Sequence, residues 1–189
     1  MSIEDLTLTI KPKSDQLNAD DLISGPRTVF IEDVRLGTTE DQPVLLELGE
    51  GLQPYKPCKS MRRLLVFCWG KNGNHWKGRN MTIFNDASVT WAGQAIGGIR
   101  ISHLSDIEKA VSVALTTTRG KRKPYTVEPL VLPAYDSSLF EENMPAWTKA
   151  IQGGKITALD LTLKITKLKT LSKEQHRTIM ALAPQHSDL

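Results

Sequence analysis

Residues Thr28-Val29-Phe30-Ile31-Glu32-Asp33-Val34-Arg35-Leu36 predict a β-strand, because β-branched and aromatic side chains dominate the run. Turn residues follow at 37–41, and residues 43–48 predict a second strand. Residues 58–69 predict a helix, since only Val66 is β-branched and Gly70 stands where a helix C-terminal glycine is expected. The predicted order of elements from residue 28 to residue 69 is therefore strand, strand, helix.

The rest of the chain continues with strands and then changes period. Further strands are expected at 3–10, 81–84, 89–91, 99–102, 111–115 and 125–132. Capping boxes at Ser138–Glu141 and Ser172–Gln175, with another helix start at Thr157, predict three short helices. We therefore predict a mainly β fold with α: a polar segment at 1–24, an OB-fold-like small barrel at 25–134 and a short helical C-terminal tail at 137–189.

The composition is that of an ordinary globular protein, with 40% apolar and 24% charged residues among 189. No apolar run approaches the ~18 residues of a membrane helix, and the first residues lack a secretory signal pattern. We expect a cytoplasmic protein that has no membrane association. The two cysteines, Cys58 and Cys68, exclude a disulfide framework and a four-cysteine zinc site, and we expect both to be buried.

Motifs for catalysis are absent from the sequence. The four histidines do not have metal-ligand spacing, and Gly97-Gly98 is not followed by the Lys-Ser or Lys-Thr of a phosphate loop. Ser102 and His103 are neighbours in sequence, which does not make a catalytic triad. We therefore expect a protein that is not an enzyme and that needs neither a metal nor another cofactor.

Charge is distributed unevenly along the chain. Residues 1–55 carry a net charge of −7, residues 56–128 carry +9 and residues 129–189 carry +1. The stretch 51–85 contains no acidic residue, and six of the eleven aromatic residues lie between 55 and 91. Cations that follow phosphates and rings that stack on bases are typical of proteins that bind single-stranded nucleic acid. The same composition also fits a solvated basic face over an aromatic core.

Fifteen residues form the predicted nucleic-acid site. Trp76 is expected to be exposed, because it lies in a Gly- and Asn-rich loop with Lys71, Lys77 and Arg79, where its indole either folds back as a lid or stacks on a ligand. Trp69 and Trp91 lie closer to regular elements and could pack in the core instead. The full set is Tyr55, Lys56, Lys59, Arg62, Arg63, Trp69, Lys71, Trp76, Lys77, Arg79, Trp91, Arg100, Lys121, Arg122 and Lys123.

Three segments resemble a known family. The stretch from Tyr55 to Arg63 with Trp69-Gly70, the stretch Gly78–Thr82 and the stretch Gly97–His103 resemble small, mostly uncharacterised phage and prophage proteins encoded among DNA recombination and replication functions. Residues 151–157 and 171–175 resemble a short helical module at the C-termini of several phage DNA-metabolism proteins. Neither resemblance supplies a catalytic or binding residue. The end of the chain also lacks the acidic, Phe-terminated tip of bacterial single-strand-binding proteins.

Together these features predict an accessory protein of phage recombination or replication that binds single-stranded DNA. Its tail would contact phage recombination or replication proteins, and a homo-oligomer is compatible with the sequence. An alternative is a phage interaction protein that inhibits a host defence or nuclease protein through its acidic N-terminal region, as a partial mimic of DNA charge.

Overall fold

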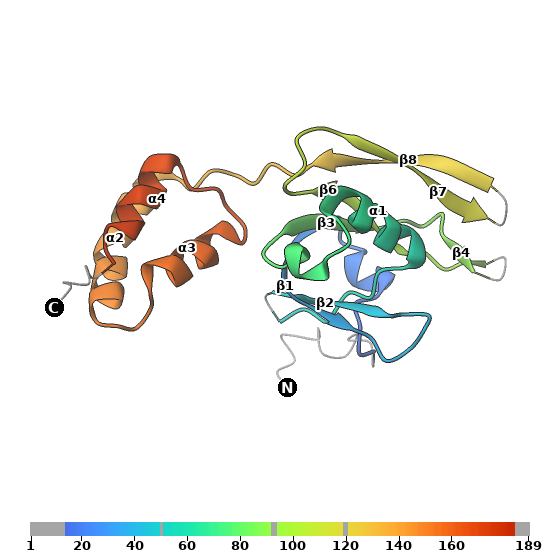
Figure 1. Cartoon of the computed structure of the whole chain (residues 1–189), viewed down its shortest axis with the longest axis horizontal. Coiled ribbons are helices and arrows are strands. Elements are labelled where there is room, and N and C mark those ends of the chain that lie inside the picture. The colour runs from blue at the N-terminus through green and yellow to red at the C-terminus, as the bar shows by residue number, and fades with distance from the viewer. Residues whose placement is uncertain (1–13, 50, 92–93, 119–120, 184–189) are drawn as a thin grey trace.

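The computed structural model describes residues 14–49, 51–91, 94–118 and 121–183. It is a mixed α/β structure with a six-stranded sheet and four α-helices. The expected strand at 3–10 lies outside the described residues. Figure 1 shows helix α1 in front of the sheet, the β7–β8 hairpin extending beyond it, and helices α2 to α4 grouped to one side at the end of an extended connection.

The six strands follow the order β2-β1-β3-β6-β8-β7, and all neighbours are antiparallel except β6 and β8. Strand β1 pairs with β3 through its first residues and with β2 through its last ones. Strands β2 and β7 are the edges of an open sheet, so a closed barrel is not shown. The bounds are β1 Arg27–Leu36, β2 Val44–Leu48, β3 Asn80–Asn85, β6 Ile99–Leu104, β7 Val111–Thr118 and β8 Lys121–Pro129, with a separate pair β4 Thr90–Trp91 and β5 Gln94–Ala95.

Helix α1 (Lys59–Trp69) follows β2 and packs its apolar side into the main core. Met61, Leu64 and Leu65 are fully buried there, together with residues of β1, β3 and β6. The helix ends at Gly70, whose φ of 87° is readily available only to glycine. The predicted helix at 58–69 is confirmed to within one residue.

The exposure of Cys58 corrects an expectation. It was expected to be buried, but it is exposed, because it is the N-cap residue of α1 and lies where the chain turns into the helix. Cys68, on the inner part of the same helix, packs partly against the main core. Burial raises the pKa of the Cys68 thiol above its ordinary value.

The tail has its own hydrophobic core. Helices α2 (Ser137–Gln152), α3 (Ala158–Thr166) and α4 (Lys173–Met180) enclose Phe140, Ile151, Leu161 and Ile179. The capping box at Ser172 is confirmed, since Ser172 and Gln175 exchange the two expected hydrogen bonds. The capping box at Ser138 is wrong: α2 begins earlier, because the Asp136 carboxylate accepts the Leu139 backbone N–H at 2.9 Å and acts as the N-cap.

Lys167 holds the tail against the sheet. Its Nζ lies 2.6 Å from Glu32 Oε1 and 5.0 Å from the centre of the Phe30 ring, both on β1. The buried side-chain amide of Asn80, on β3, donates to the Lys167 carbonyl. An isolated bridge between Ala134 and Thr170 also joins the extended connection to the segment between α3 and α4. The tail therefore has contacts with the sheet in addition to its covalent connection.

Candidate nucleic-acid interface

The outward side of α1 carries cations and one aromatic ring. Lys59 and Arg63 are exposed, Arg62 is partly exposed, and Phe67 is 66% exposed. This arrangement follows from the helical period, since residues three or four apart lie on the same side. The opposite side is held in the core by Met61, Leu64 and Leu65, so the cationic side must face the solvent.

The β7–β8 hairpin contacts this helix and carries two more cations. Thr116, on β7, accepts hydrogen bonds from Ser60 Oγ at 3.4 Å and from Arg63 Nη1 at 3.5 Å. In the strand ladder, Thr116 lies opposite Arg122, and Leu115 lies opposite Lys123. Arg122 and Lys123 are both exposed. Because they are consecutive residues of a strand, their side chains lie on opposite faces of the hairpin. We call the set Lys59, Arg62, Arg63 and Phe67 the α1 basic face.

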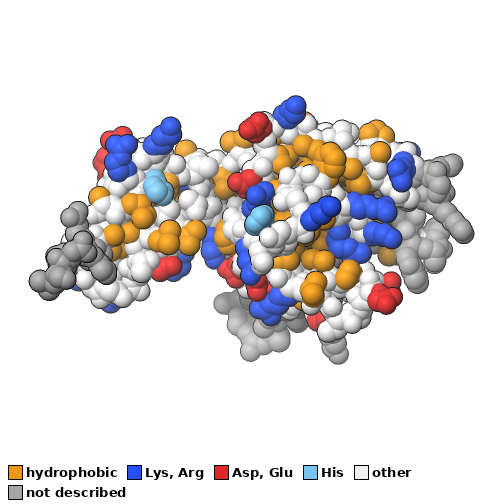
Figure 2. Space-filling view, viewed as in Figure 1, with side chains coloured by type: hydrophobic (Ala, Val, Ile, Leu, Met, Phe, Trp, Pro, Cys, Tyr) orange, Lys and Arg blue, Asp and Glu red, His pale blue; other side chains and the backbone are white. Residues whose placement is uncertain are grey.

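The α1 basic face contains no acidic side chain, and within the described residues none of its cations forms an ion pair with a carboxylate. Figure 2 shows Lys and Arg side chains gathered over α1, with another beside the β7–β8 hairpin. Arg62 donates to the backbone carbonyls of Pro57 and Asp41 at 3.0 and 3.3 Å, which fixes its guanidinium at the border with the exposed acidic loop of Glu40 and Asp41. The other cations of this face are available to a phosphate backbone.

Three predicted stacking residues are buried, and Trp76 corrects the expectation of an exposed indole. Trp76 is only 4% exposed, and its Nε1 donates to the Gly70 carbonyl at 3.0 Å. Its ring lies 6.5 Å from that of Trp69, whose Nε1 donates to the Ser105 carbonyl at 2.8 Å. Tyr55 is 2% exposed and its hydroxyl donates to the Ile99 carbonyl. A short 3₁₀-helix at Gly73–Trp76 folds the loop of Trp76 inwards. Because all three rings are buried, they cannot stack on bases in this structure.

Four predicted cations are engaged with acidic groups from other parts of the chain. Lys56 Nζ lies 2.8 Å from Asp15, and Lys77 Nζ lies 2.5 Å from Asp33. The other two are Arg79, which lies 4.0 Å from Asp106 and over the Trp69 ring, and Arg100, which lies 3.8 Å from Asp86 and 3.0 Å from the Cys58 sulfur. The positive charge of these four residues is therefore partly neutralised in the folded protein.

The remaining predicted residues are placed as follows. Lys71 is exposed just after the end of α1. Trp91 lies in β4 and Lys121 begins β8, but their side chains lie outside the described residues. The structure thus places three of the predicted cations on the α1 basic face and two on the hairpin that contacts α1, whereas the predicted rings of Tyr55, Trp69 and Trp76 are buried.

Phe67 is the residue that the sequence analysis missed. On a wheel of about 100° per residue it lies about 40° from Arg63 and well away from Met61 and Leu65, so the period already indicated an outward position. A phenylalanine within an apolar run is usually buried, so its residue type argued against an exposed position. An exposed ring among cations is the arrangement that base stacking needs.

The Lys77–Asp33 pair gives a prediction about pH. The Lys77 ammonium, assisted by the Val34 N–H and by Arg35, lowers the pKa of the Asp33 carboxyl from 3.8 to about 2. Because the folded pKa is depressed, the stability that Asp33 contributes is present above pH 3.8 and is lost as the pH falls towards 2. We expect Lys77→Met to raise the pKa of Asp33, measured by NMR titration of its side-chain carboxyl carbon. An unchanged titration would contradict the pairing.

Other kinds of site have little support in this structure. No three His, Cys, Asp or Glu side chains come together in a metal-binding group in the described part of the chain. Ser102 Oγ and His103 Nδ1 lie 2.9 Å apart, and Ser102 also donates to the Thr82 carbonyl at 3.4 Å, so this hydroxyl is part of the β3–β6 hydrogen bonding. Across the described helices, none is long and apolar enough to cross a bilayer.

Comparison with known proteins gives no match: no family model, no curated protein and no solved structure is similar to the chain. The resemblance to phage proteins therefore stays a prediction from the sequence.

Proposed function

We propose that the chain is an accessory protein of phage recombination or replication that binds single-stranded DNA without catalysis, through the α1 basic face. The observation that carries this proposal is the exposed Phe67 ring next to Arg63, on a helix side that has cations and no carboxylates. The cations would follow the phosphates, and the ring would stack on a base whatever its identity.

A single strand is favoured over a duplex by the shape and content of this face. A duplex keeps its bases stacked inside the helix, so an exposed ring has little to stack on, whereas a single strand presents its bases to a protein surface. The element order, with two strands and a helix before the third strand, led to the OB-like expectation. That order remains compatible with this mode of binding in a sheet that is open.

Salt dependence tests the proposal. If the three cations of the α1 basic face and the two of the hairpin that contacts α1 together neutralise about four or five phosphates, the slope of log K against log salt should be about −3 on single strands. Fluorescence anisotropy with a labelled oligothymidylate, recorded from low to moderate salt, measures this slope. Absence of binding at low salt would refute the proposal, and a duplex of equal length that bound equally well would refute the preference for single strands.

The alternative, an acidic N-terminal region that binds a host protein, receives less support. Several acidic side chains of that region have partners within the chain: Asp15 pairs with Lys56, Asp33 with Lys77 and Glu32 with Lys167. The Lys56 contact also lowers the pKa of the Asp15 carboxyl. These carboxylates are used within the fold, which leaves less acidic surface to imitate DNA.

A further inference from the structure

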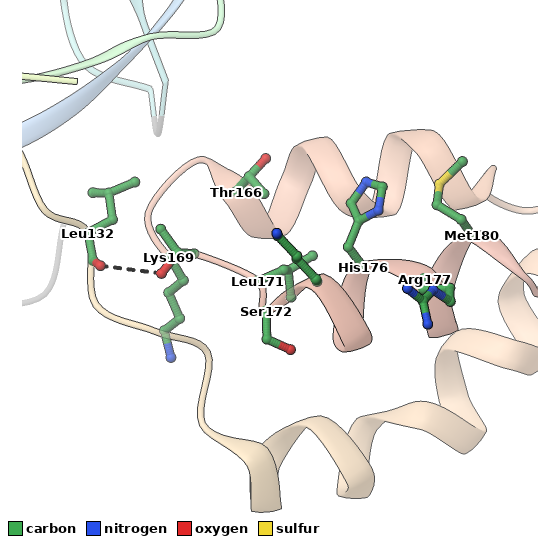
Figure 3. Close-up of a pocket in the computed structure, with 10 residues that line it drawn as sticks. Leu132, Thr166, Lys169, Leu171, Ser172, His176, Arg177 and Met180 are labelled. Carbon is green, nitrogen blue, oxygen red and sulfur yellow. Dashed lines mark hydrogen bonds between the residues drawn. The ribbon is translucent and has the colours of Figure 1, made fainter. Parts of the chain in front are cut away.

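The tail contains a groove that the proposed function does not use. It has a volume of about 690 Å³ and lies between helix α4, the segment that precedes it and Leu132 of the extended connection. Figure 3 shows Lys169, Leu171 and Ser172 on the segment before α4, and His176, Arg177 and Met180 on the helix itself. The groove is open to the solvent. Leu132 precedes the tail helices, and the other lining residues come from the end of α3, from α4 and from the segment between them.

The α4 side of the groove is a cationic stripe. Lys173, His176, Arg177 and Met180 are spaced as one side of a helix, and all four are exposed. The opposite side of α4 is fixed in the tail core by Ile179, which is fully buried. Within the described residues no carboxylate pairs with Lys173 or Arg177, and no acidic residue lines the groove.

The rest of the groove is apolar rather than aromatic. Leu132, Leu171 and Met180 line it, together with two threonines. Lys169 adds a further cation, and its Nζ lies 4.9 Å from the centre of the Tyr135 ring, so that ring already has a cationic neighbour. Among the described residues that line the groove there is no Phe, Tyr or Trp, and His176 contributes the one ring. Charge complementarity calls for an acidic occupant, and the apolar lining calls for one that also carries aliphatic side chains.

We propose that this groove binds an acidic peptide segment of a partner protein. Its carboxylates would contact Lys173 and Arg177, and an aliphatic side chain between them would lie on Leu171 and Met180. Carboxylates pair well with a guanidinium, while the aliphatic side chain supplies apolar burial that a phosphate backbone lacks. This inference is independent of the proposed function, because the groove and the α1 basic face share no residue.

The test uses the full chain and short fluorescein-labelled peptides of defined composition. The first peptide alternates aspartate with leucine, the second replaces leucine by serine, and the third replaces aspartate by lysine. A labelled oligothymidylate is the nucleic-acid probe. The charge-reversal variant is Lys173→Glu with Arg177→Glu. Its matched control is Lys149→Glu with Lys155→Glu, which changes two exposed cations of the tail outside the groove.

We expect the Asp-Leu peptide to bind best and the groove variant to weaken its binding by about tenfold or more, while the matched control changes little. Equal binding of the Asp-Ser peptide, stronger binding of the lysine peptide, or an equal loss in the control variant would overturn the proposal. Loss of oligothymidylate binding in the groove variant, with no peptide binding by the native chain, would assign the groove to nucleic acid instead. Circular dichroism checks that both variants are folded, as expected for exposed positions.

Discussion

Replacing Trp76 by alanine is expected to destabilise the protein by about 3–5 kcal/mol without weakening the binding of single-stranded DNA to the molecules that remain folded. The indole is 4% exposed and packs next to Trp69, so its removal leaves a cavity in the main core. It also leaves the Gly70 carbonyl without its donor. For a chain of this length the melting temperature should fall by about 6–20 °C, measured by circular dichroism.

Phe67→Ala is the matched control for this experiment, because it also removes an aromatic ring but from an exposed position. We expect the melting temperature to change little, and the affinity for oligothymidylate to fall by about 1–3 kcal/mol, roughly five- to 150-fold. Trp76→Ala should therefore lower the stability and leave the affinity unchanged, whereas Phe67→Ala should lower the affinity and leave the stability nearly unchanged. A Trp76→Ala protein of native stability that binds DNA weakly would mean that the indole leaves the core to stack on a base.

Reversing two charges on α1 is expected to weaken the binding of single-stranded DNA strongly. Lys59 and Arg63 are exposed and have no carboxylate partner within the described residues, so Lys59→Glu with Arg63→Glu should leave the fold intact. Counterion release at about 0.1 M salt contributes roughly fivefold per phosphate on a single strand, so the loss of two contacts should cost about 25-fold or more. The salt slope should become shallower by about 1.4.

Anisotropy titrations at several salt concentrations measure both quantities on the same variant. Lys149→Glu with Lys155→Glu makes the same change in net charge on the tail, so it separates the loss of a specific face from a general loss of positive charge. If both double variants lose affinity to the same extent, binding depends on net charge alone, and the α1 basic face is not the site.

Local patterns were enough to predict most of the regular elements. The β-branched run at 28–36 forms β1, and the segment from 58 to 69 becomes α1 because its apolar side matches the helical period. The pairing of strands was harder to predict. β1 divides its length between β2 and β3, and β6 pairs with β8 in parallel, so the sheet depends on contacts between distant segments that no local pattern contains.

The candidate site was predictable only in part, for a related reason. The cations of α1 stand out in an acid-free stretch, but so do Lys56 and Lys77, whose partners Asp15 and Asp33 come from the acidic first part of the chain. Net charge along a sequence does not show which charges meet in space. In the same way, glycines around Trp76 suggested an exposed loop, whereas the ring closes over the main core next to Trp69.

The contact of Lys167 with the sheet has a consequence for the order in which the protein folds. Lys167 and Glu32 are 135 residues apart, and Asn80 and Lys167 are 87 apart. A ribosome releases the strands of the sheet before it has made α3, so the sheet can form while the buried amide of Asn80 still lacks its acceptor. Docking of the tail is then a late step that joins residues far apart in the sequence, and it gives the buried Asn80 amide its acceptor.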